Sequence, residues 1–392
     1  MVPIVTTDSQ LTELCRRLAA CPTIAFDTEF VSEHTYRPQL CLIQVAAEGE
    51  LAAIDALAIE DLTPFWEVVA TPGHETVVHA GREEIAFCLA AVDKPPAGLF
   101  DVQLAAGFIG LEYPAGYGNL ISKLLSVTPR KGETRTDWRR RPLSDRQIDY
   151  ALEDVRHLRP LRDILHGRLV ELGRVDWFAG ETADFVKEID ESRRRERWRK
   201  VSGSSGLSAR SKAIVRELWL WRDREAARRN CPVKRVLRDD LIVELAKRRS
   251  SDPKQVRAIR GMERGDLLRL LPSLCQAIET ALSVPDEECP AIARREASAQ
   301  LTMLGQFLSS ALSSICRAAE VAPSLVGTAN DVRDLVAYQL GEFDSDDREP
   351  PLLAQGWRAE VVGQLLDDLL AGKVSIRIRD PRAEQPLAFE RE

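Results

Sequence analysis

Short apolar runs alternate with amphipathic stretches in the N-terminal part of the chain. The runs Thr23–Phe26, Leu40–Ala46 and Thr76–His79 have the length and composition of strands. Apolar residues recur at helical spacing in Leu11–Ala20 and Glu83–Ala91. Because strands and amphipathic helices alternate, we expect an α/β fold with a mixed sheet flanked by helices.

The pattern changes near residue 205. Apolar stripes then recur at a spacing of 3.6 with no strand-like alternation, which predicts small helical bundles. Before the change, the basic run RRRERWRK is followed by VSGSSG, a composition typical of a linker. The charged C-terminal tail is expected to be frayed. We therefore expect an α/β domain at 1–180 and a basic and Gly/Ser linker at 181–206. Two helical domains follow at 207–285 and 290–375, and a tail at 376–392.

Composition narrows the class of protein. The N-terminus lacks a basic segment followed by an apolar run, and no stretch reaches the roughly 18–20 apolar residues of a membrane span, so we expect a cytoplasmic protein. None of the eight cysteines forms a CxxC pair, which argues against a disulfide framework or a zinc site. The net charge of −7 argues mildly against a nucleic-acid partner, unless basic residues gather locally.

Two acidic residues follow the first predicted strand. In a strand, side chains alternate between faces, so Asp27 and Glu29 point the same way. Two carboxylates on one face repel each other unless a cation lies between them, and Mg²⁺ or Mn²⁺ prefers such oxygen ligands. The alternative is a strand that runs into a polar turn.

Two further acidic segments come later in the chain. Tyr150 and Asp154 are four residues apart in a predicted helix and share one face of it. A strand-like run ends at His79, and an Ala-Gly turn opens a helix with Glu83 and Glu84. Either glutamate could add a carboxylate, or both could simply favour the first helical turn. His79 is interpreted as a packed or capping histidine.

These segments together resemble a known family. The stretches IAFDTEF, YRPQLCLIQVA, HAGREEIAFCL, LFDVQLAAGFIG and TRTDWRRRPLSDRQIDYALEDVRHL resemble the tyrosine-bearing branch of the DEDD exonuclease superfamily, and within it the ribonuclease D family. The resemblance covers most of residues 3–175. It implies a ribonuclease H-like fold and a 3′–5′ exoribonuclease that releases 5′-mononucleotides with two divalent cations, Mg²⁺ or Mn²⁺.

The resemblance also implies roles for individual residues. Asp27, Glu29 and Asp154 match metal ligands, and Tyr150 matches the catalytic tyrosine, which we expect to position the attacking water. Glu84 stands where the family usually has aspartate. Its carboxylate reaches one methylene further, so the site is expected to be looser or to favour Mn²⁺, and the change to be tolerated.

Basic residues gather in the loop Thr128–Arg141, which has six basic and two acidic residues. Lys131, Arg139 and Arg140 are candidates for phosphate contacts with RNA, and a solvated loop is the alternative. Arg141 precedes a proline and is interpreted as structural. We expect Trp138 to pin the loop.

The helical part resembles the HRDC domain over residues 207–282, and residues 290–372 resemble the second helical domain of the ribonuclease D family. HRDC domains bind nucleic acid or serve in packing. Basic residues cluster in the first domain, at Arg222, Arg228, Arg229, Lys234, Arg235 and Arg238, and nucleic-acid binding and packing both remain open for it. Trp357 is expected in the core.

The resemblance makes single-stranded 3′ ends of RNA, such as those of tRNA precursors, the expected substrate. A monomer is expected, because nothing in the sequence suggests a coiled coil or an edge-to-edge assembly. Two alternatives remain open. A catalytically weak RNA-binding scaffold is one, with Glu84 as its support. A DNA 3′–5′ exonuclease is the other, since the residues include no specific reader of the 2′-hydroxyl.

Overall fold

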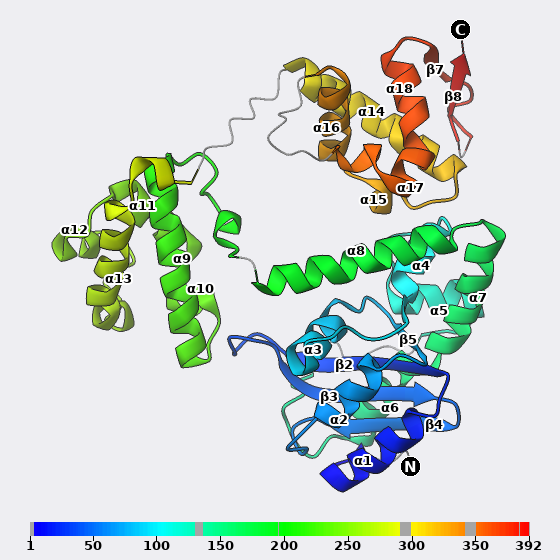
Figure 1. The fold of residues 1–392 in the computed structure, drawn as a ribbon, viewed down its shortest axis with the longest axis horizontal. Coiled ribbons are helices and arrows are strands. Elements are labelled where there is room, and N and C mark those ends of the chain that lie inside the picture. Colours follow the sequence, from blue (N-terminus) through cyan, green and yellow to red (C-terminus); the bar gives the residue numbers. More distant parts are fainter. Residues whose placement is uncertain are drawn as a thin grey trace.

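The N-terminal part is built on a mixed six-stranded sheet. The computed structural model describes residues 4–129, 136–194, 196–290, 299–341, 350–383 and 385–391. Within these described residues, the strands of the six-stranded sheet lie in the order β1-β4-β3-β2-β5-β6 (Figure 1). The strands β2–β3 and β3–β4 pair antiparallel, and the other neighbours pair parallel. The strands span Ile4–Val5, Thr23–Val31, Gln39–Ala47, Glu50–Asp55, Glu75–Val78 and Leu99–Asp101.

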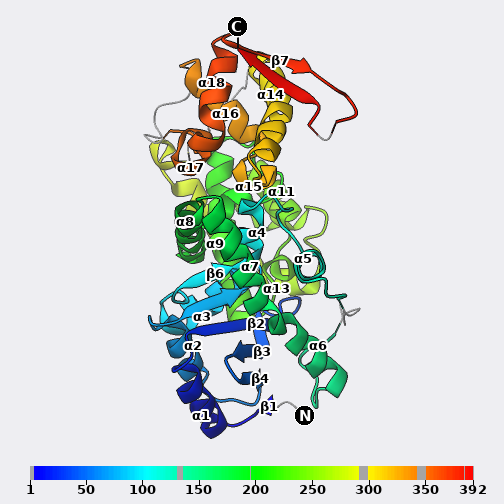
Figure 2. The same cartoon turned by 90° about the vertical axis from the view of Figure 1, so that its right-hand side faces the viewer.

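Helices cover both faces of the sheet, as the α/β pattern predicts. On one face, α1 (Asp8–Leu18), α2 (Thr63–Ala70) and α3 (Arg82–Val92) enclose a core that includes Phe26. On the other face lies α6 (Asp145–Arg156), seen opposite α1 and α2 in Figure 2. The helices α4 (Val102–Phe108), α5 (Tyr117–Leu125) and α7 (Leu158–Glu171) complete the core on this side.

The second strand is longer than the apolar run at its start. It continues through the acidic residues to Val31, because its pairing with β3 persists there, with a shift of register between Glu29 and Phe30. A bulge of this kind bends a strand and re-aims its side chains. The acidic pair therefore lies within the sheet instead of in a turn after it.

A single long helix crosses the predicted boundary at residue 180. The helix α8 spans Val175–Arg194 and leads toward α9 in Figure 1. The segment expected to be a linker is partly folded, because a short 3₁₀ helix forms at Trp198–Lys200. Trp198 and Val201 are buried in the core of the following helices.

The first helical domain has its own core. It comprises α9 (Ala209–Arg229), α10 (Val233–Val236), α11 (Asp239–Arg248), α12 (Pro253–Arg257) and α13 (Gly265–Ser283). It contacts the loop after β2, where the Tyr36 hydroxyl donates to Asp223 (2.8 Å) and the Tyr36 amide to Asn230 (3.2 Å).

The C-terminal helices share a core with the α/β domain. They are α14 (Ala299–Ala318), α15 (Pro323–Val326), α16 (Ala329–Gln339), α17 (Gly356–Arg358) and α18 (Gln364–Leu370). The buried Arg174 side chain donates to the carbonyls of Phe108 and Glu320, at 2.6 Å each. Trp357 is buried against Phe108, which confirms its expected place in the core.

The expectation of a frayed C-terminal tail was wrong. The strands β7 (Val374–Ile378) and β8 (Leu387–Arg391) pair as an antiparallel hairpin. An ion pair between Arg391 and Asp368 (3.4 Å) ties the hairpin to α18. None of the helices in the described ranges has the length and apolarity needed to cross a membrane.

Candidate active site

The strand β2 presents two carboxylates toward α6. Pairing with β3 places Asp27 opposite Gln44 and Glu29 opposite Leu42. Leu42 packs with residues of α6 such as Leu152, so this face of the sheet lies under α6. The alternation predicted from the sequence is therefore confirmed for the acidic pair.

The helix α6 contributes a tyrosine and an aspartate to the same region. Its N-terminus is fixed by a capping box between Ser144 and Gln147. Tyr150 and Asp154 lie one turn apart and are partly buried, as their spacing predicts. The Trp138 ring stacks on Tyr150, with 6.4 Å between centroids and 25° between planes. Trp138 thus pins the loop and also restrains the tyrosine ring.

The first turn of α3 adds Glu84, and the structure separates it from Glu83. The Glu84 side chain is only 4% exposed, and its Oε1 accepts a hydrogen bond from Thr28 Oγ1 at 2.6 Å. Before it, the Asp101 carboxylate accepts hydrogen bonds from the Ala80 and Gly81 amides (3.1 and 2.9 Å). This contact fixes the turn that directs Glu84 toward β2.

Burial raises the pKa values of all four carboxylates, and neighbouring carboxylates add to the effect. Burial, then the charges of Asp154 and Glu84, raises the pKa of Glu29 to about 8. Burial, then Glu84, Asp154 and Glu29, raises the pKa of Asp27 well above its ordinary value. The pKa of Glu84 rises to about 7, mainly through burial, and that of Asp154 also to about 7, through burial and Glu153. The site is therefore a concentration of unbalanced negative charge.

The donor set fits a hard divalent cation. Within the described ranges, no lysine, arginine or histidine forms an ion pair with Asp27, Glu29 or Asp154. In the same ranges, no three His, Cys, Asp or Glu side chains already converge as ligands on one point. Oxygen-only donors of this charge are those that Mg²⁺ and Mn²⁺ prefer.

The raised pKa values predict that alkali destabilises the metal-free protein. Glu29, Glu84 and Asp154 titrate near 7–8 in the folded state, against 4.5, 4.5 and 3.8 for the free side chains. A carboxyl whose folded pKa is raised supplies stability below its unfolded pKa, and this is lost as pH rises through the folded pKa. In EDTA, the melting temperature should therefore fall between about pH 5 and pH 8.5.

Thermal unfolding at pH 6 and pH 8.5 checks this expectation. Mg²⁺ or Mn²⁺ should raise the melting temperature more at pH 8.5, where the carboxylates are charged. Glu29→Gln removes one of the titrating groups and should flatten the pH dependence in EDTA. Equal metal-induced shifts at both pH values would contradict the prediction.

The candidate phosphate-binding loop is only partly described. Lys131 lies outside the described residues. Arg139 is paired with Asp137 (2.9 Å) and Arg140 is 85% exposed. Next to Glu29 along β2 is a hollow of about 440 Å³, lined by Phe30, Val31, Ser32, Glu33, His34, Thr136, Asp137 and Arg139.

Arg141 has the structural role expected of it. Its guanidinium donates to both oxygens of the buried Asp55 (2.5 and 2.6 Å) and to the carbonyls of Trp138 and Cys41. These bonds hold the loop against the face of the sheet that α6 covers. Gln44 lies on the same face.

The sequence motifs did not identify three residues that lie at the site. Thr28 and Gln44 are polar residues within apolar strands, and Tyr117 lies in a loop-to-helix junction without a recognised spacing. The Tyr117 hydroxyl donates to the Glu153 carbonyl (2.9 Å), beside Asp154. The His79 ring lies edge-on to Tyr117 (5.7 Å), and its Nε2 donates to the Ala115 carbonyl (2.9 Å), so His79 packs as expected.

Most of the clustered basic residues of the first helical domain are paired with acidic side chains. Arg222 is 3% exposed and bonded to Asp239 (2.6 Å), so of the two open interpretations packing holds for this residue. Arg228 and Arg229 pair with Glu225, Lys234 with Asp239, and Arg238 with Asp240.

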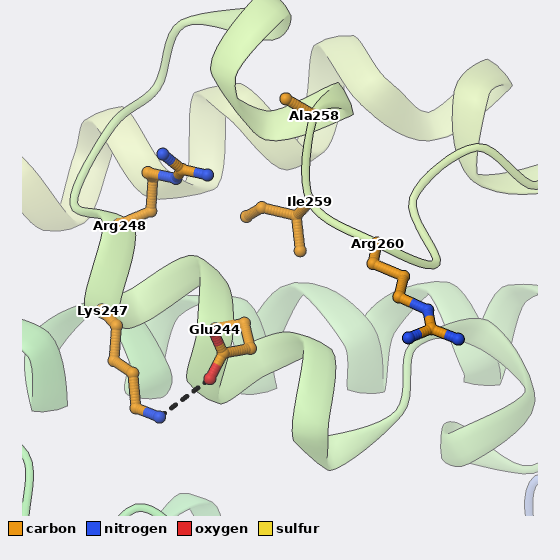
Figure 3. Close-up of a pocket in the computed structure, with 6 residues that line it drawn as sticks. All are labelled: Glu244, Lys247, Arg248, Ala258, Ile259 and Arg260. Atoms are coloured by element: carbon orange, nitrogen blue, oxygen red, sulfur yellow. Dashed lines mark hydrogen bonds and ion pairs between the residues drawn. The ribbon is translucent and has the colours of Figure 1, made fainter.

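A separate basic hollow lies between α11 and the segment after α12. Figure 3 shows its lining residues around a space of about 410 Å³: Glu244, Lys247, Arg248, Ala258, Ile259 and Arg260. Lys247 pairs with Glu244 (2.8 Å). Within the described part of the chain, Arg248 and Arg260 form no ion pair.

Known proteins match both the parts and the whole of the chain. A 3′–5′ exonuclease family model matches residues 2–169, and the HRDC domain model matches residues 211–278. Ribonuclease D of Acidiphilium cryptum is 35% identical over 385 residues, covering 97% of this chain and 96% of its own. Ribonuclease D of Zymomonas mobilis is 34% identical, with 96% of each chain covered.

Solved structures agree with this picture. RNase D of Escherichia coli, described as an exoribonuclease involved in structured RNA processing, has a TM-score of 0.81 and 27% identity, and 95% of this chain and 99% of that one are covered. A protein from Bifidobacterium adolescentis has the same fold, with a TM-score of 0.69, 24% identity, and coverage of 95% and 97%. The predicted fold class is confirmed. The chain belongs to the ribonuclease D family and is a 3′–5′ exoribonuclease.

Proposed function

We propose that this enzyme shortens single-stranded 3′ ends of RNA by two-metal hydrolysis, releases 5′-mononucleotides, and acts as a monomer on tRNA precursors in the cytoplasm. The observation that carries the proposal is the group of four acidic side chains with raised pKa values beside Tyr150. A buried group of this charge is costly unless it serves to bind cations.

The four carboxylates and Tyr150 have different roles in the proposed mechanism. Two divalent cations, Mg²⁺ or Mn²⁺, would polarise the scissile phosphate and lower the pKa of the attacking water. Asp27, Glu29, Glu84 and Asp154 would hold them. Burial and the nearby Asp154 charge raise the pKa of Tyr150 to about 12, so its hydroxyl keeps its proton and orients the water.

Thr28 supports the view that Glu84 is a functional replacement for aspartate. A glutamate side chain has an extra torsion, and loss of that freedom on metal binding costs affinity. The hydrogen bond from Thr28 Oγ1 (2.6 Å) already restrains the Glu84 carboxylate. This restraint favours an active enzyme over a catalytically weak scaffold.

The assay is a time course on 5′-labelled single-stranded RNA with a short 3′ tail, in Mg²⁺, in Mn²⁺ and in EDTA. We expect a ladder that shortens from the 3′ end in both metals and is absent in EDTA. A DNA oligomer of the same sequence tests the alternative of a DNA exonuclease, and a tRNA precursor transcript tests the proposed substrate. Intact RNA in both metals, with RNA binding retained, would favour the scaffold.

We propose the basic hollow of Figure 3 as an RNA backbone contact outside the active site. The double variant Arg248→Ala/Arg260→Ala should weaken binding of long RNA about tenfold and lower the salt slope by about two, because two phosphate contacts are lost. Filter binding across a salt series measures both quantities.

Two controls sharpen this prediction. If the hollow contacts RNA outside the active site, hydrolysis of a four-nucleotide RNA should change much less in the double variant than binding of long RNA. Arg228→Ala removes an arginine already paired with Glu225 (2.7 Å) and should leave long-RNA binding near the wild-type value. An unchanged salt slope in the double variant would exclude the hollow as a contact.

A further inference from the structure

Gln44 is a buried amide without a hydrogen-bond partner. Its side chain is 0% exposed, and neither Oε1 nor Nε2 has a partner. Buried amides in proteins are nearly always hydrogen-bonded, so one that is not requires an explanation. The explanation depends on what lies around it.

Strand register puts Gln44 beside the catalytic carboxylates. It is directly opposite Asp27 in the antiparallel β2–β3 pair, and opposite Ala53 on the other side. Residues directly opposite in such a pair share a face, with their Cβ atoms about 4.5–5.5 Å apart. Gln44 therefore shares with Asp27 the face that α6 covers.

Most of the side chains around Gln44 on this face are apolar. Ala53, Leu42, Ala151 and Leu152 form one buried cluster between β3, β4 and α6. None of their side chains can donate to or accept from an amide. The carboxylates of Glu29 and Asp55 lie diagonal to Gln44 on this face, and both Asp55 oxygens already accept hydrogen bonds from Arg141 (2.5 and 2.6 Å). The Asp27 carboxylate is the polar side chain directly opposite Gln44.

We propose that Gln44 is a positioning residue for the Asp27 carboxylate. The Gln44 Nε2 would donate to one oxygen of the Asp27 carboxylate and so leave the other oxygen to hold a divalent cation in a fixed orientation. Carboxylates that bind metals are themselves commonly hydrogen-bonded, and loss of such a partner costs about 10–100-fold in metal affinity or activity.

The inference rests on the proposed metal mechanism and is tested with Gln44→Met in the full-length chain. The metal-free variant should melt at roughly 2 °C higher temperature, because an unsatisfied amide is replaced by an apolar side chain of similar volume. Mn²⁺ affinity, measured by calorimetry, should fall about 10–100-fold, and kcat should fall with an unchanged KM for RNA.

Different results would overturn the inference. A merely structural glutamine predicts a lower metal-free melting temperature and unchanged Mn²⁺ affinity. Gln44→Asn keeps an amide on a shorter side chain and should show an intermediate Mn²⁺ affinity; an affinity equal to that of Gln44→Met would contradict the role of the amide.

Two further variants separate this inference from the mechanism on which it rests. Ile43→Leu changes the same strand on its opposite face and should leave Mn²⁺ affinity unchanged. If Asp27→Asn retains Mn²⁺ binding and activity, the metal mechanism itself fails. If Asp27→Asn is inactive and Gln44→Met matches the wild type, only the role of Gln44 fails.

Discussion

Asp27→Asn is expected to lower kcat on single-stranded RNA by about 10³-fold, since it removes several kcal/mol of transition-state stabilisation. The side chain lies at the centre of the site: its pKa is raised by burial and then by the charges of Glu84, Asp154 and Glu29. Asparagine has nearly the same shape but no charge, so it cannot hold a divalent cation in the same way.

The same change should make the metal-free protein more stable at pH 8. The Asp27 pKa is raised in the folded state, which means that folding favours the neutral form of this side chain. Asparagine is neutral at every pH. A variant that is inactive and at the same time melts at a higher temperature separates loss of chemistry from loss of folding.

Asp149→Asn is the matched control for this variant. Asp149 is an exposed acid on α6, one residue before Tyr150. Its replacement removes one negative charge from the same helix and should leave kcat near the wild-type value. Substantial activity in Asp27→Asn, with the control unchanged, would show that Asp27 is not a ligand.

Local periodicity predicted the parts of the site that lie on one element. Strand alternation places Asp27 and Glu29 on one face, and the spacing of four residues places Tyr150 and Asp154 on one side of a helix. Both relations depend only on neighbours in the chain. The choice between Glu83 and Glu84 does not, because it depends on how α3 packs against Thr28.

Relations between strands could not be predicted in this way. Gln44 stands opposite Asp27 only because of the register between β2 and β3. A shift of one residue would move it to the other face of the sheet. Within the sequence, Gln44 is simply one polar residue in an apolar run, and nothing in its spacing marks it as a neighbour of the site.

The structure of two segments also differs from what their composition predicts. The Gly/Ser-rich stretch was interpreted as a linker, yet Val201 within the same region is buried in a helical core. The charged C-terminal tail forms a hairpin because alternating residues such as Ile376 and Phe389 pair across it. In both cases, contacts with other parts of the chain outweigh local polarity.

Tyr150→Phe should lower kcat about 10²-fold while KM for RNA and Mn²⁺ affinity stay near the wild-type values. The phenylalanine ring can keep its stack on Trp138, so the helix and the carboxylates are preserved. Only the hydroxyl that orients the attacking water is lost. Single-turnover hydrolysis of labelled RNA, together with Mn²⁺ titration, measures the three quantities.

The pH profile of this variant distinguishes a positioning hydroxyl from a general base. Burial and the charges of Asp154, Glu29 and Asp27 raise the pKa of Tyr150 to about 12, so it stays protonated throughout the working range. A positioning hydroxyl therefore predicts parallel profiles for wild type and variant between about pH 7 and pH 10. Tyr113→Phe removes a tyrosine hydroxyl outside the carboxylate group and should change neither rate nor profile. A different result would be a wild-type rate that rises with pH and a rise that Tyr150→Phe abolishes. In that case Tyr150 accepts a proton from the attacking water as a general base, and it does more than orient the water.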